Sequence, residues 1–428
     1  MTRLIIIDPS LVDQRGHHYL LSSTITHAAK EAGMEVVWLA NINYSLPKEK
    51  QGFEIIPAFT STMYDKYHKG ANSKTSSSGQ LSNELRMSLQ ALQAGSEDHL
   101  LIHTAFFGFY EALLDFISAA RTMALPNIHV CTPYDDSTMP GRPSDQGVRD
   151  LLKKVALHCE TERSLFLWAE THQLAHYYRE MLGVCVYPLP LPVSNPPKVS
   201  RMQAQSFQQI DHNRRFTLVY MGAAREEKGF CEIPDLIKLC KQSAQVWSKV
   251  KFIIHSAPQI IGYNAKILEA IRKLEQYDPE IVKLIKSPLE DSEYHQLIDT
   301  ADIVLLLYNQ QNYQVRGSGI AVEAVVKGKS LLTTNGTFCA SLIDQDGGRA
   351  VSTLDEAFQF ILEYVLNPEK YQGSAEQQGC TYCRENSGLH YIERLIFRQK
   401  ASIRNWKRPS DVVGHLSPLL VQPVGLDV

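Results

Sequence analysis

Short apolar runs alternate with segments of mixed polarity along most of this 428-residue chain. The runs have the length and continuity of parallel strands that are buried on both faces, and the segments between them carry apolar residues at helical spacing. Such alternation predicts repeated strand–helix units around parallel sheets. The predicted strands of the first half are 3–7, 35–39, 100–103, 127–132, 165–169 and 184–189. Those of the second half are 216–221, 250–255, 281–285, 303–307 and 330–334.

A cluster of prolines separates the two series of strands. The cluster consists of Pro188, Pro190, Pro192, Pro196 and Pro197 and has the composition of a linker. We therefore expect an α/β protein with a Rossmann-like domain over 1–195 and a second Rossmann-like domain over 196–375. The remaining helices and tail, 376–428, are expected to pack back on the first domain. A ligand would lie in the cleft between the two domains.

A glycine-rich segment in the second half has the features of an anion site. The segment Arg316-Gly317-Ser318-Gly319 follows a polar loop after the strand 303–307 and opens an apolar helix. Free backbone N–H groups and the positive end of the helix dipole favour an anion such as a phosphate at this point. Glu323, about one turn into the helix, could accept hydrogen bonds from ribose hydroxyls. The alternative is an ordinary crossover with a tight turn.

Polar residues in the first half also follow predicted strands, where open α/β sheets bind ligands. The loop after 3–7 contains Gly16-His17-His18, whose histidines either touch a ligand or cap the helix. Asp135 and Asp136 follow 127–132 and are candidate catalytic acids, or else they cap the next helix. The polar stretch 60–83 predicts a loop that closes over an acceptor or is a surface insertion.

Composition excludes several classes of protein. A net charge of −3 and 21% charged residues indicate a globular protein with no nucleic-acid partner. No apolar run is long enough to span a membrane, and the start of the chain lacks a signal-peptide layout. The eight cysteines are scattered, which is typical of reduced thiols in a cytoplasmic protein. Cys380 and Cys383 form a lone CxxC pair with no second pair to complete a metal site.

Two blocks of the second half together resemble the family 4 retaining glycosyltransferases. Tyr220-Met221-Gly222 with Arg225 and Lys228-Gly229-Phe230 resembles their phosphate-binding loop, in the variant with arginine three residues before lysine. A second set of residues resembles the donor-binding block of the same family. It consists of 302–308, Arg316, Ser318-Gly319, Glu323-Ala324 and Gly328-Lys329. The resemblance spans 3–396, with Gly16-His17-His18 at the acceptor-side glycine loop and 189–192 at the domain boundary.

The resemblance implies the GT-B fold, in which two Rossmann-like domains face each other and the second holds a nucleotide sugar. It implies a cytoplasmic hexosyltransferase that moves a sugar with retention, by front-face attack, from a UDP- or GDP-linked donor. The acceptor would be a glycan, a lipid-linked sugar or another hydroxyl compound, as in polysaccharide biosynthesis. The expected catalytic residues are Arg225, Lys228, Asp135 and His103. The expected donor-binding residues are Gly16, His17, Gly222, Arg225, Lys228, Arg316, Ser318, Gly319 and Glu323.

Neither a metal nor another cofactor is expected. Arg225 and Lys228, together with N–H donors at the helix start, would stabilise the leaving diphosphate in place of a metal. The string Asp344-Gln345-Asp346 matches a DxD metal motif of another glycosyltransferase fold, but glycines bound this loop and predict a turn.

Two positions depart from the family pattern. Val315 occupies the place of the first of two glutamates spaced eight apart, so the contacts to the donor sugar are open. Tyr134 occupies the place of a histidine, for which His103 could substitute. A sugar-nucleotide epimerase and a catalytically silent protein that binds a nucleotide sugar or a partner are the alternatives. We expect at most peripheral membrane attachment, with Lys66, Lys69 and Lys74 as the contacts.

Overall fold

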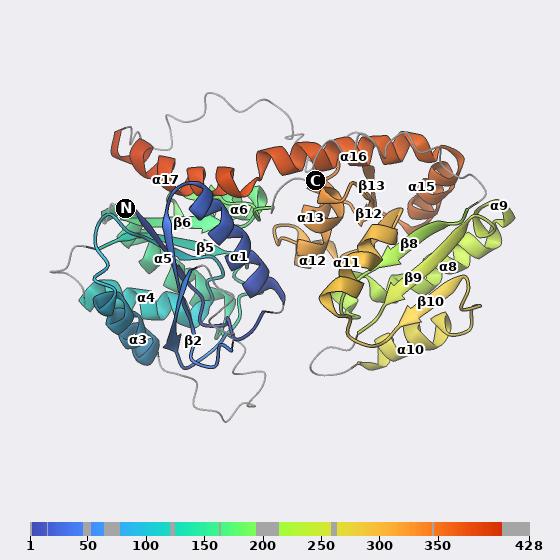
Figure 1. Ribbon diagram of the computed structural model, residues 1–428. Helices are drawn as coiled ribbons and strands as arrows, with labels where there is room; N and C mark the ends of the chain where they lie inside the picture. The colour runs from blue at the N-terminus through green and yellow to red at the C-terminus, as the bar shows by residue number, and fades with distance from the viewer. Residues whose placement is uncertain are drawn as a thin grey trace, which may run out of the picture.

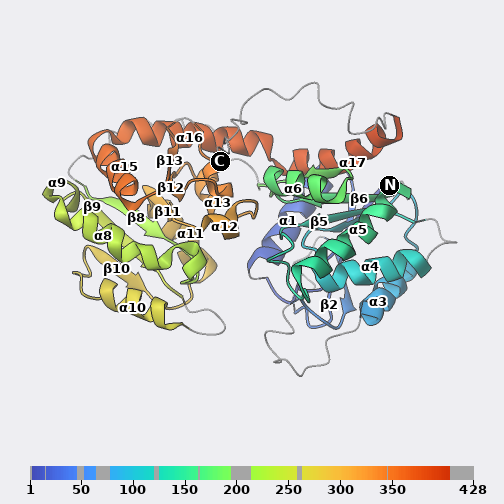
Figure 2. The same cartoon turned by 180° about the vertical axis from the view of Figure 1, so that it is seen from behind.

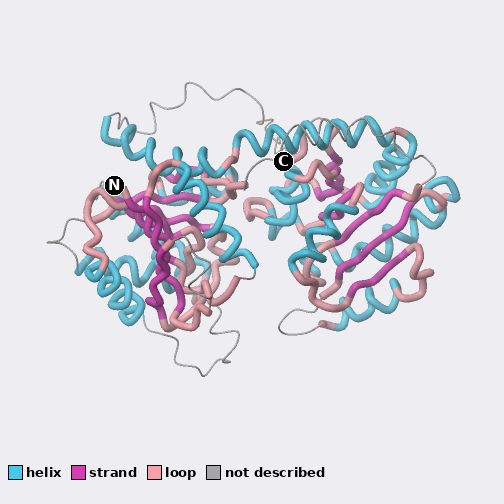
Figure 3. Tube along the Cα trace, in the orientation of Figure 1, coloured by secondary structure: helices cyan, strands magenta, loops and turns pink. Residues whose placement is uncertain are grey.

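The chain folds into two α/β lobes that lie side by side, with two long C-terminal helices along one side of both (Figures 1 and 2). Each lobe contains one fully parallel sheet, visible as a separate set of strands in Figure 3. The computed structural model describes residues 2–14, 16–45, 53–63, 78–119, 125–161, 164–193, 214–257, 263–344 and 346–404. The predicted α/β class with two Rossmann-like domains is confirmed.

The first sheet has the order β3-β2-β1-β4-β5-β6-β7. Its strands are β1 (Arg3–Ile7), β2 (Glu35–Asn41), β3 (Glu54–Phe59), β4 (His99–Ile102), β5 (Asn127–Thr132), β6 (Leu165–Ala169) and β7 (Val186–Pro188). Its helices are α1 (Gly16–Glu31), α3 (Ser78–Ala91), α4 (Phe107–Ala119), α5 (Asp145–Thr161) and α6 (His172–Leu182). Side chains alternate along β1, so Ile5 and Ile7 face one core and Leu4 and Ile6 face the other.

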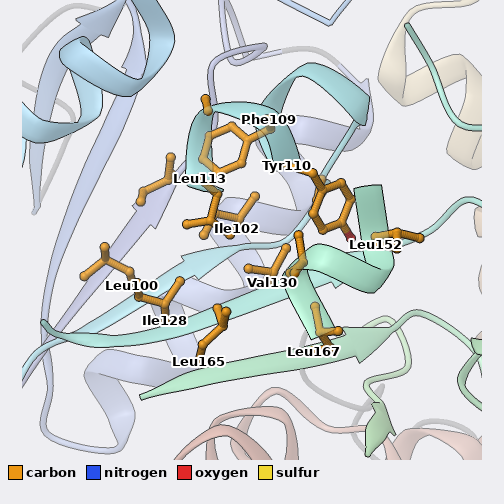
Figure 4. Close-up of a cluster of buried hydrophobic side chains, with 14 of the residues drawn as sticks. Leu100, Ile102, Phe109, Tyr110, Leu113, Ile128, Val130, Leu152, Leu165 and Leu167 are labelled. Atoms are coloured by element: carbon orange, nitrogen blue, oxygen red, sulfur yellow. The ribbon is translucent and has the colours of Figure 1, made fainter. Parts of the chain in front are cut away.

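The larger core of the first domain lies between the sheet and helices α3 to α6. Figure 4 shows leucine, isoleucine and valine side chains of β4, β5 and β6 pointing toward Phe109, Tyr110 and Leu113 of α4 and Leu152 of α5. This continuous packing on both faces explains why the strands are unbroken apolar runs. The packed sheet holds its strand ends, and the loops that follow them, in fixed positions.

The second sheet has the order β10-β9-β8-β11-β12-β13. Its strands are β8 (Phe216–Tyr220), β9 (Val250–His255), β10 (Val282–Ile285), β11 (Ile303–Leu306), β12 (Ser330–Thr334) and β13 (Gly348–Val351). Its α-helices are α8 (Ile233–Gln242), α9 (Ala244–Trp247), α10 (Ala265–Leu274), α11 (Asp291–Thr300), α12 (Gln310–Tyr313), α13 (Gly319–Val326), α14 (Phe338–Ser341), α15 (Leu354–Leu366) and α16 (Pro368–Glu385). Short 3₁₀ turns, η2 (Glu226–Lys228) and η3 (Phe230–Glu232), precede α8.

The strand order reverses direction next to the first strand of each sheet. In the first sheet β1 lies between β2 and β4, and in the second β8 lies between β9 and β11. Parallel sheets bind ligands outside the carboxyl ends of the strands at such a switch point. The loops after β1, β4, β8 and β11 are therefore the places to look for a site.

The C-terminal helices connect the two domains. Helix α16 packs on α13, where Gly379 lies against the backbone of Val325, and α17 (Gly388–Arg404) returns to the first domain. There Tyr391, Ile392 and Leu395 join a core with α1. The expected boundary at residue 375 falls inside α16, whereas the one near 195 and the tail beyond 404 lie outside the described residues.

Three elements of the first domain differ from the sequence-based expectation. Strand β3 and helix α5 had not been predicted, and α3 occupies part of the stretch 60–83 that was expected to be a loop. No helix in the described ranges is long and apolar enough to cross a membrane. The three lysines expected to touch a membrane lie outside the described residues, so peripheral attachment stays a prediction.

Candidate functional site

The loop after β8 is shaped by two glycines that adopt left-handed backbone conformations. Gly222 has φ +101° and Gly229 has φ +71°, values that side chains disfavour. A Cβ at Gly229 would overlap the carbonyl oxygen of Leu307, so only glycine lets this loop approach the end of β11. Gly222 donates its N–H to Nδ1 of His255 at 3.3 Å, while Nε2 of the same ring lies 3.1 Å from the carbonyl oxygen of Ser287. The loop is thus fixed between β9 and β11.

Lys228, at the end of η2, has an unusual electrostatic environment. Burial, with further contributions from Arg225 and Arg316, lowers the pKa of Lys228 to about 7. Its Nζ lies 5.5 Å from the ring centre of Tyr308, and among the described residues it has no ion-pair partner. An ammonium group in this setting gains strongly from a bound anion.

Arg225 is held by protein contacts but keeps one nitrogen for a ligand. Its guanidinium donates to the hydroxyl of Tyr313 at 3.2 Å and lies 3.1 Å from Glu227. Its Nε is buried and has no hydrogen-bond partner within the part of the chain that the structure describes. A buried N–H without an acceptor is costly, and an oxygen of a bound ligand would satisfy it.

The loop after β11 brings a third cation to the same place. Arg316 lies with its guanidinium carbon 5.3 Å from the ring centre of Tyr313, and no ion pair forms at Arg316 among the described residues. Ser318 caps α13 by accepting from the backbone N–H of Ala321. The sequence correctly predicted that a helix starts at Gly319. Arg225 and Arg316 both act electrostatically on Lys228, so the three cations lie near one another.

Glu323 lies within α13 and faces α11. Its carboxylate accepts a hydrogen bond from Tyr294, and burial together with Glu323 raises the pKa of that phenol. Glu323 is only partly buried. The contact with Tyr294 fixes the carboxylate, and whether it also takes ribose hydroxyls stays a prediction.

The first domain directly contacts the loop that follows β11. Thr171 caps α6 and donates its hydroxyl to the carbonyl oxygen of Val315 at 2.7 Å. The side chain of Val315 packs against the larger core of the first domain. Tyr134 lies 5.9 Å from the guanidinium carbon of Arg316, so this cation has one tyrosine ring from each domain beside it. The position that departs from the family pattern, Val315, is therefore part of the contact between the domains.

A histidine cluster lies at the switch point of the first sheet. Asp8 Oδ2 lies 2.8 Å from Nδ1 of His18 and 3.4 Å from Nε2 of His103. His103 also contacts the hydroxyls of Ser22 at 2.8 Å and Thr104 at 2.8 Å. Although burial opposes it, the Asp8 carboxylate raises the pKa of His18, whereas burial lowers that of His103 to about 4. The Asp8 carboxylate thus favours the protonated form of His18, whereas burial favours the neutral form of His103.

His17 and Gly16 lie at the edge of this cluster. His17 Nε2 is 3.2 Å from the hydroxyl of Thr104, and the local desolvation together with His18 and His103 lowers its pKa, although the residue is still exposed to solvent. Gly16 has φ +71° and begins α1. The structure thus brings Gly16, His17 and His103 together on the first domain, whereas Arg225, Lys228 and Arg316 belong to the second.

Asp135 has a structural role that the sequence left open. Its Oδ1 accepts from the backbone N–H and the hydroxyl of both Ser137 and Thr138, at 2.7 to 3.0 Å. Asp136 accepts from Tyr177 at 2.6 Å and pairs with Arg149. Both acids therefore organise the turn after β5, and a catalytic role for Asp135 stays a prediction.

In the described part of the chain, no group of three or more histidine, cysteine, aspartate or glutamate side chains is arranged so that it could hold a metal ion. Around the DxD string, the backbone N–H of Asp344 donates to Gln378 at 2.7 Å, that of Gly347 donates to the Asp344 carbonyl at 3.0 Å, and Asp346 pairs with Lys370 at 3.1 Å. These contacts tie the loop to α16.

Comparisons with known proteins identify solved structures that have a similar architecture. No family model and no curated protein matches the chain. Sucrose-phosphate synthase from Thermosynechococcus elongatus matches with a TM-score of 0.64 at 10% identity, over 94% of this chain and 100% of that chain. A UDP-forming α,α-trehalose-phosphate synthase from Burkholderia xenovorans, in complex with glucose-6-phosphate, matches with a TM-score of 0.64 at 14% identity over 93% and 100%.

The N-terminal domain of a trehalose-6-phosphate phosphatase from Candida albicans matches with a TM-score of 0.63 at 11% identity, over 94% of this chain and 96% of that chain. At these identities the likeness shows the fold. The chain has the GT-B fold, as expected. Membership of family 4 stays a prediction, since the similar structures named here are sucrose- and trehalose-phosphate proteins.

Proposed function

We propose that the protein is a glycosyltransferase that binds a nucleotide sugar through its diphosphate and transfers the sugar with retention. The convergence of Arg225, Lys228 and Arg316 at the switch point of the second sheet carries this proposal. Lys228 and Arg316 have no carboxylate partner among the described residues, and Nε of Arg225 lacks an acceptor there. A diphosphate supplies the missing negative charge and the missing acceptors together.

The same cations would act in the reaction. As the bond between sugar and diphosphate breaks, negative charge develops on the leaving phosphate. Lys228, Arg225 and Arg316, together with the backbone N–H groups at the start of α13, would stabilise this charge. No metal is needed for that task, because fixed cations replace it.

The acceptor would bind to the first domain near the histidine cluster. One similar structure is a complex with glucose-6-phosphate, and that protein is named a trehalose-phosphate synthase. His18, whose pKa Asp8 raises against the effect of burial, and the neighbouring His17 and His103 offer hydrogen-bonding groups for a hydroxyl compound or a sugar phosphate. Glycans, lipid-linked sugars and hexose phosphates are therefore the acceptors to test.

A catalytically silent protein of this fold is the second candidate. Val315, where the family has its first glutamate, is used for the contact between the domains. One similar structure is a domain of a protein named as a phosphatase. Nucleotide-sugar binding would then serve recognition instead of transfer.

A panel experiment separates these candidates. The protein is titrated with UDP, GDP and their glucose and mannose conjugates, and release of nucleoside diphosphate is measured with and without acceptors. Acceptor-dependent release supports the transferase. Conversion of the sugar nucleotide into its epimer indicates an epimerase. Binding with neither release nor conversion under all conditions supports the silent protein, and no binding of any of these compounds refutes the proposed site.

A further inference from the structure

The carboxylate of Glu170 lies where the two domains meet. Glu170 directly follows β6, and its backbone N–H donates to the carbonyl oxygen of Thr132 at 3.1 Å. The next residue, Thr171, makes the hydrogen bond to Val315 that joins the domains. Oε1 of Glu170 lies so close to Gly317 that a Cβ there would overlap it. The absence of a side chain at Gly317 thus lets a carboxylate of the first domain reach the donor loop of the second.

The protein itself leaves this carboxylate unused. In the described ranges Glu170 forms neither a side-chain hydrogen bond nor an ion pair, although the residue is partly buried. Capping of α6 is the task of Thr171. The other ionisable groups whose electrostatics involve Glu170 are Cys131, Tyr382 and Tyr391, and each has a pKa raised by burial. Because a desolvated carboxylate without partners costs stability, its retention points to a ligand.

Its neighbour Arg316 ties Glu170 to the cation cluster. Burial raises the pKa of Glu170 to about 7, and Arg316 acts in the opposite direction. The same arginine lowers the pKa of Lys228. Arg316, one residue before Gly317, is thus near both the carboxylate of Glu170 and the ammonium group of Lys228.

We propose that Glu170 accepts hydrogen bonds from hydroxyl groups of the sugar in the bound nucleotide sugar. The inference rests on the proposed function and names a residue that would bind the sugar, the part of the ligand beyond the diphosphate. A ligand with an anionic end and a polyol end matches the nearby cations and the carboxylate that lies against Gly317. Carboxylates accept from neighbouring hydroxyls with charge-assisted hydrogen bonds, which discriminate among sugars. Glu170 therefore selects the donor sugar, from the first domain.

The test compares a nucleotide with its sugar conjugate. Glu170→Gln keeps the size and removes the charge, and Glu180→Gln makes the same change at an exposed position of α6. Calorimetric titrations use UDP, GDP and their glucose and mannose conjugates. We expect Glu170→Gln to weaken binding of the sugar nucleotide about 10-fold to 100-fold, the effect of losing a hydrogen bond to a charged group. The affinity of Glu170→Gln for UDP or GDP alone should stay within about twofold of the unaltered protein. Glu180→Gln should change neither the affinity for the sugar nucleotide nor that for UDP or GDP.

Deoxy analogues of the sugar sharpen the test. In the unaltered protein, a sugar nucleotide that lacks the hydroxyl which donates to Glu170 should bind more weakly. In Glu170→Gln, loss of the same hydroxyl should have almost no further effect on binding. Should Glu170→Gln fail to fold, the deoxy series on the unaltered protein and on Glu170→Asp, whose shorter side chain withdraws the carboxylate, gives the same comparison.

Two outcomes overturn the inference while leaving the proposed function intact. The first is an unchanged affinity of Glu170→Gln for the sugar nucleotide. The second is an equal loss of affinity for the nucleoside diphosphate and for its sugar conjugate, because Glu170 would then act through Arg316. If the unaltered protein binds neither compound, it is the proposed function that fails.

Discussion

At the scale of single residues, Lys228 connects pH to ligand binding. Its folded pKa is about 7, below the ordinary lysine value, so its ammonium is charged below pH 7 and becomes neutral above it. Only the charged form attracts a diphosphate. We expect the dissociation constant for a sugar nucleotide to rise above pH 7, by up to about tenfold per pH unit for one titrating group. A sugar nucleotide is the right probe because its diphosphate carries no group that titrates there.

The matched variant is Lys228→Met, which should bind weakly and lose this pH dependence. Because Glu170 also has a pKa of about 7, the series is repeated in the Glu170→Gln background. An affinity of the unaltered protein that stays constant from pH 6 to pH 9 would show that Lys228 does not touch the phosphates.

Glu323 has two possible roles, and a pair of variants distinguishes between them. If its carboxylate holds ribose hydroxyls, Glu323→Gln weakens nucleotide binding by about 1.5–3 kcal/mol with little change in melting temperature. If it only complements the dipole of α13 and holds Tyr294, the loss is about 0.3–1 kcal/mol of stability and nucleotide affinity is unchanged. Tyr294→Phe is the control, since it removes the hydroxyl and leaves the carboxylate. Calorimetry with UDP and GDP, beside thermal unfolding, decides between the two.

At the scale of elements, the loop between β8 and α8 depends on Gly229. Alanine there meets two obstacles, the left-handed φ of +71° and the carbonyl oxygen of Leu307. Gly33 also has a left-handed φ, +79°, but open space around it. We expect Gly33→Ala to cost about 1 kcal/mol in the free energy of unfolding. Gly229→Ala should cost more than this and should also weaken nucleotide binding, because Lys228 precedes it. Equal costs for the two variants, with binding intact, would mean that the close approach to β11 is unimportant.

Most strands and helices could be predicted from the sequence, and a few could not. Continuous apolar runs identified nearly all strands, because parallel strands are buried on both faces. Pro57 interrupts β3, which hid that strand. Helix α5 carried a readable signal, since its buried residues Val148, Leu151, Leu152 and Val155 follow helical spacing. In α3 the buried leucines recur every fourth residue, but a serine-rich start obscured the helix.

Contacts between distant segments lay beyond sequence reasoning. The loop glycines and cations near η2 and α13 belong to local motifs, so their residue types and spacing indicated an anion site. Glu170 gave no such signal, because its importance comes from Gly317 in the other domain. Thr171 and Val315 are 144 residues apart, and no local pattern predicts that they meet. Only the packed fold shows that the first domain reaches the loop after β11.

At the scale of the whole molecule, α17 packs into a core of the first domain, although it follows the second domain in the sequence. Leu395 is buried in the core that also contains Trp38 and Trp168, whereas Leu389 of the same helix is exposed. We expect Leu395→Ala to lower the free energy of unfolding of the first domain by about 2–5 kcal/mol, the usual cost of such a cavity. Leu389→Ala, the matched control, should change it by less than about 0.5 kcal/mol. Unfolding is followed by tryptophan fluorescence, in which Trp38 and Trp168 report on the first domain and Trp247 on the second. If Leu395→Ala lowers the stability of the first domain no more than Leu389→Ala does, the packing of α17 on α1 contributes little to that stability.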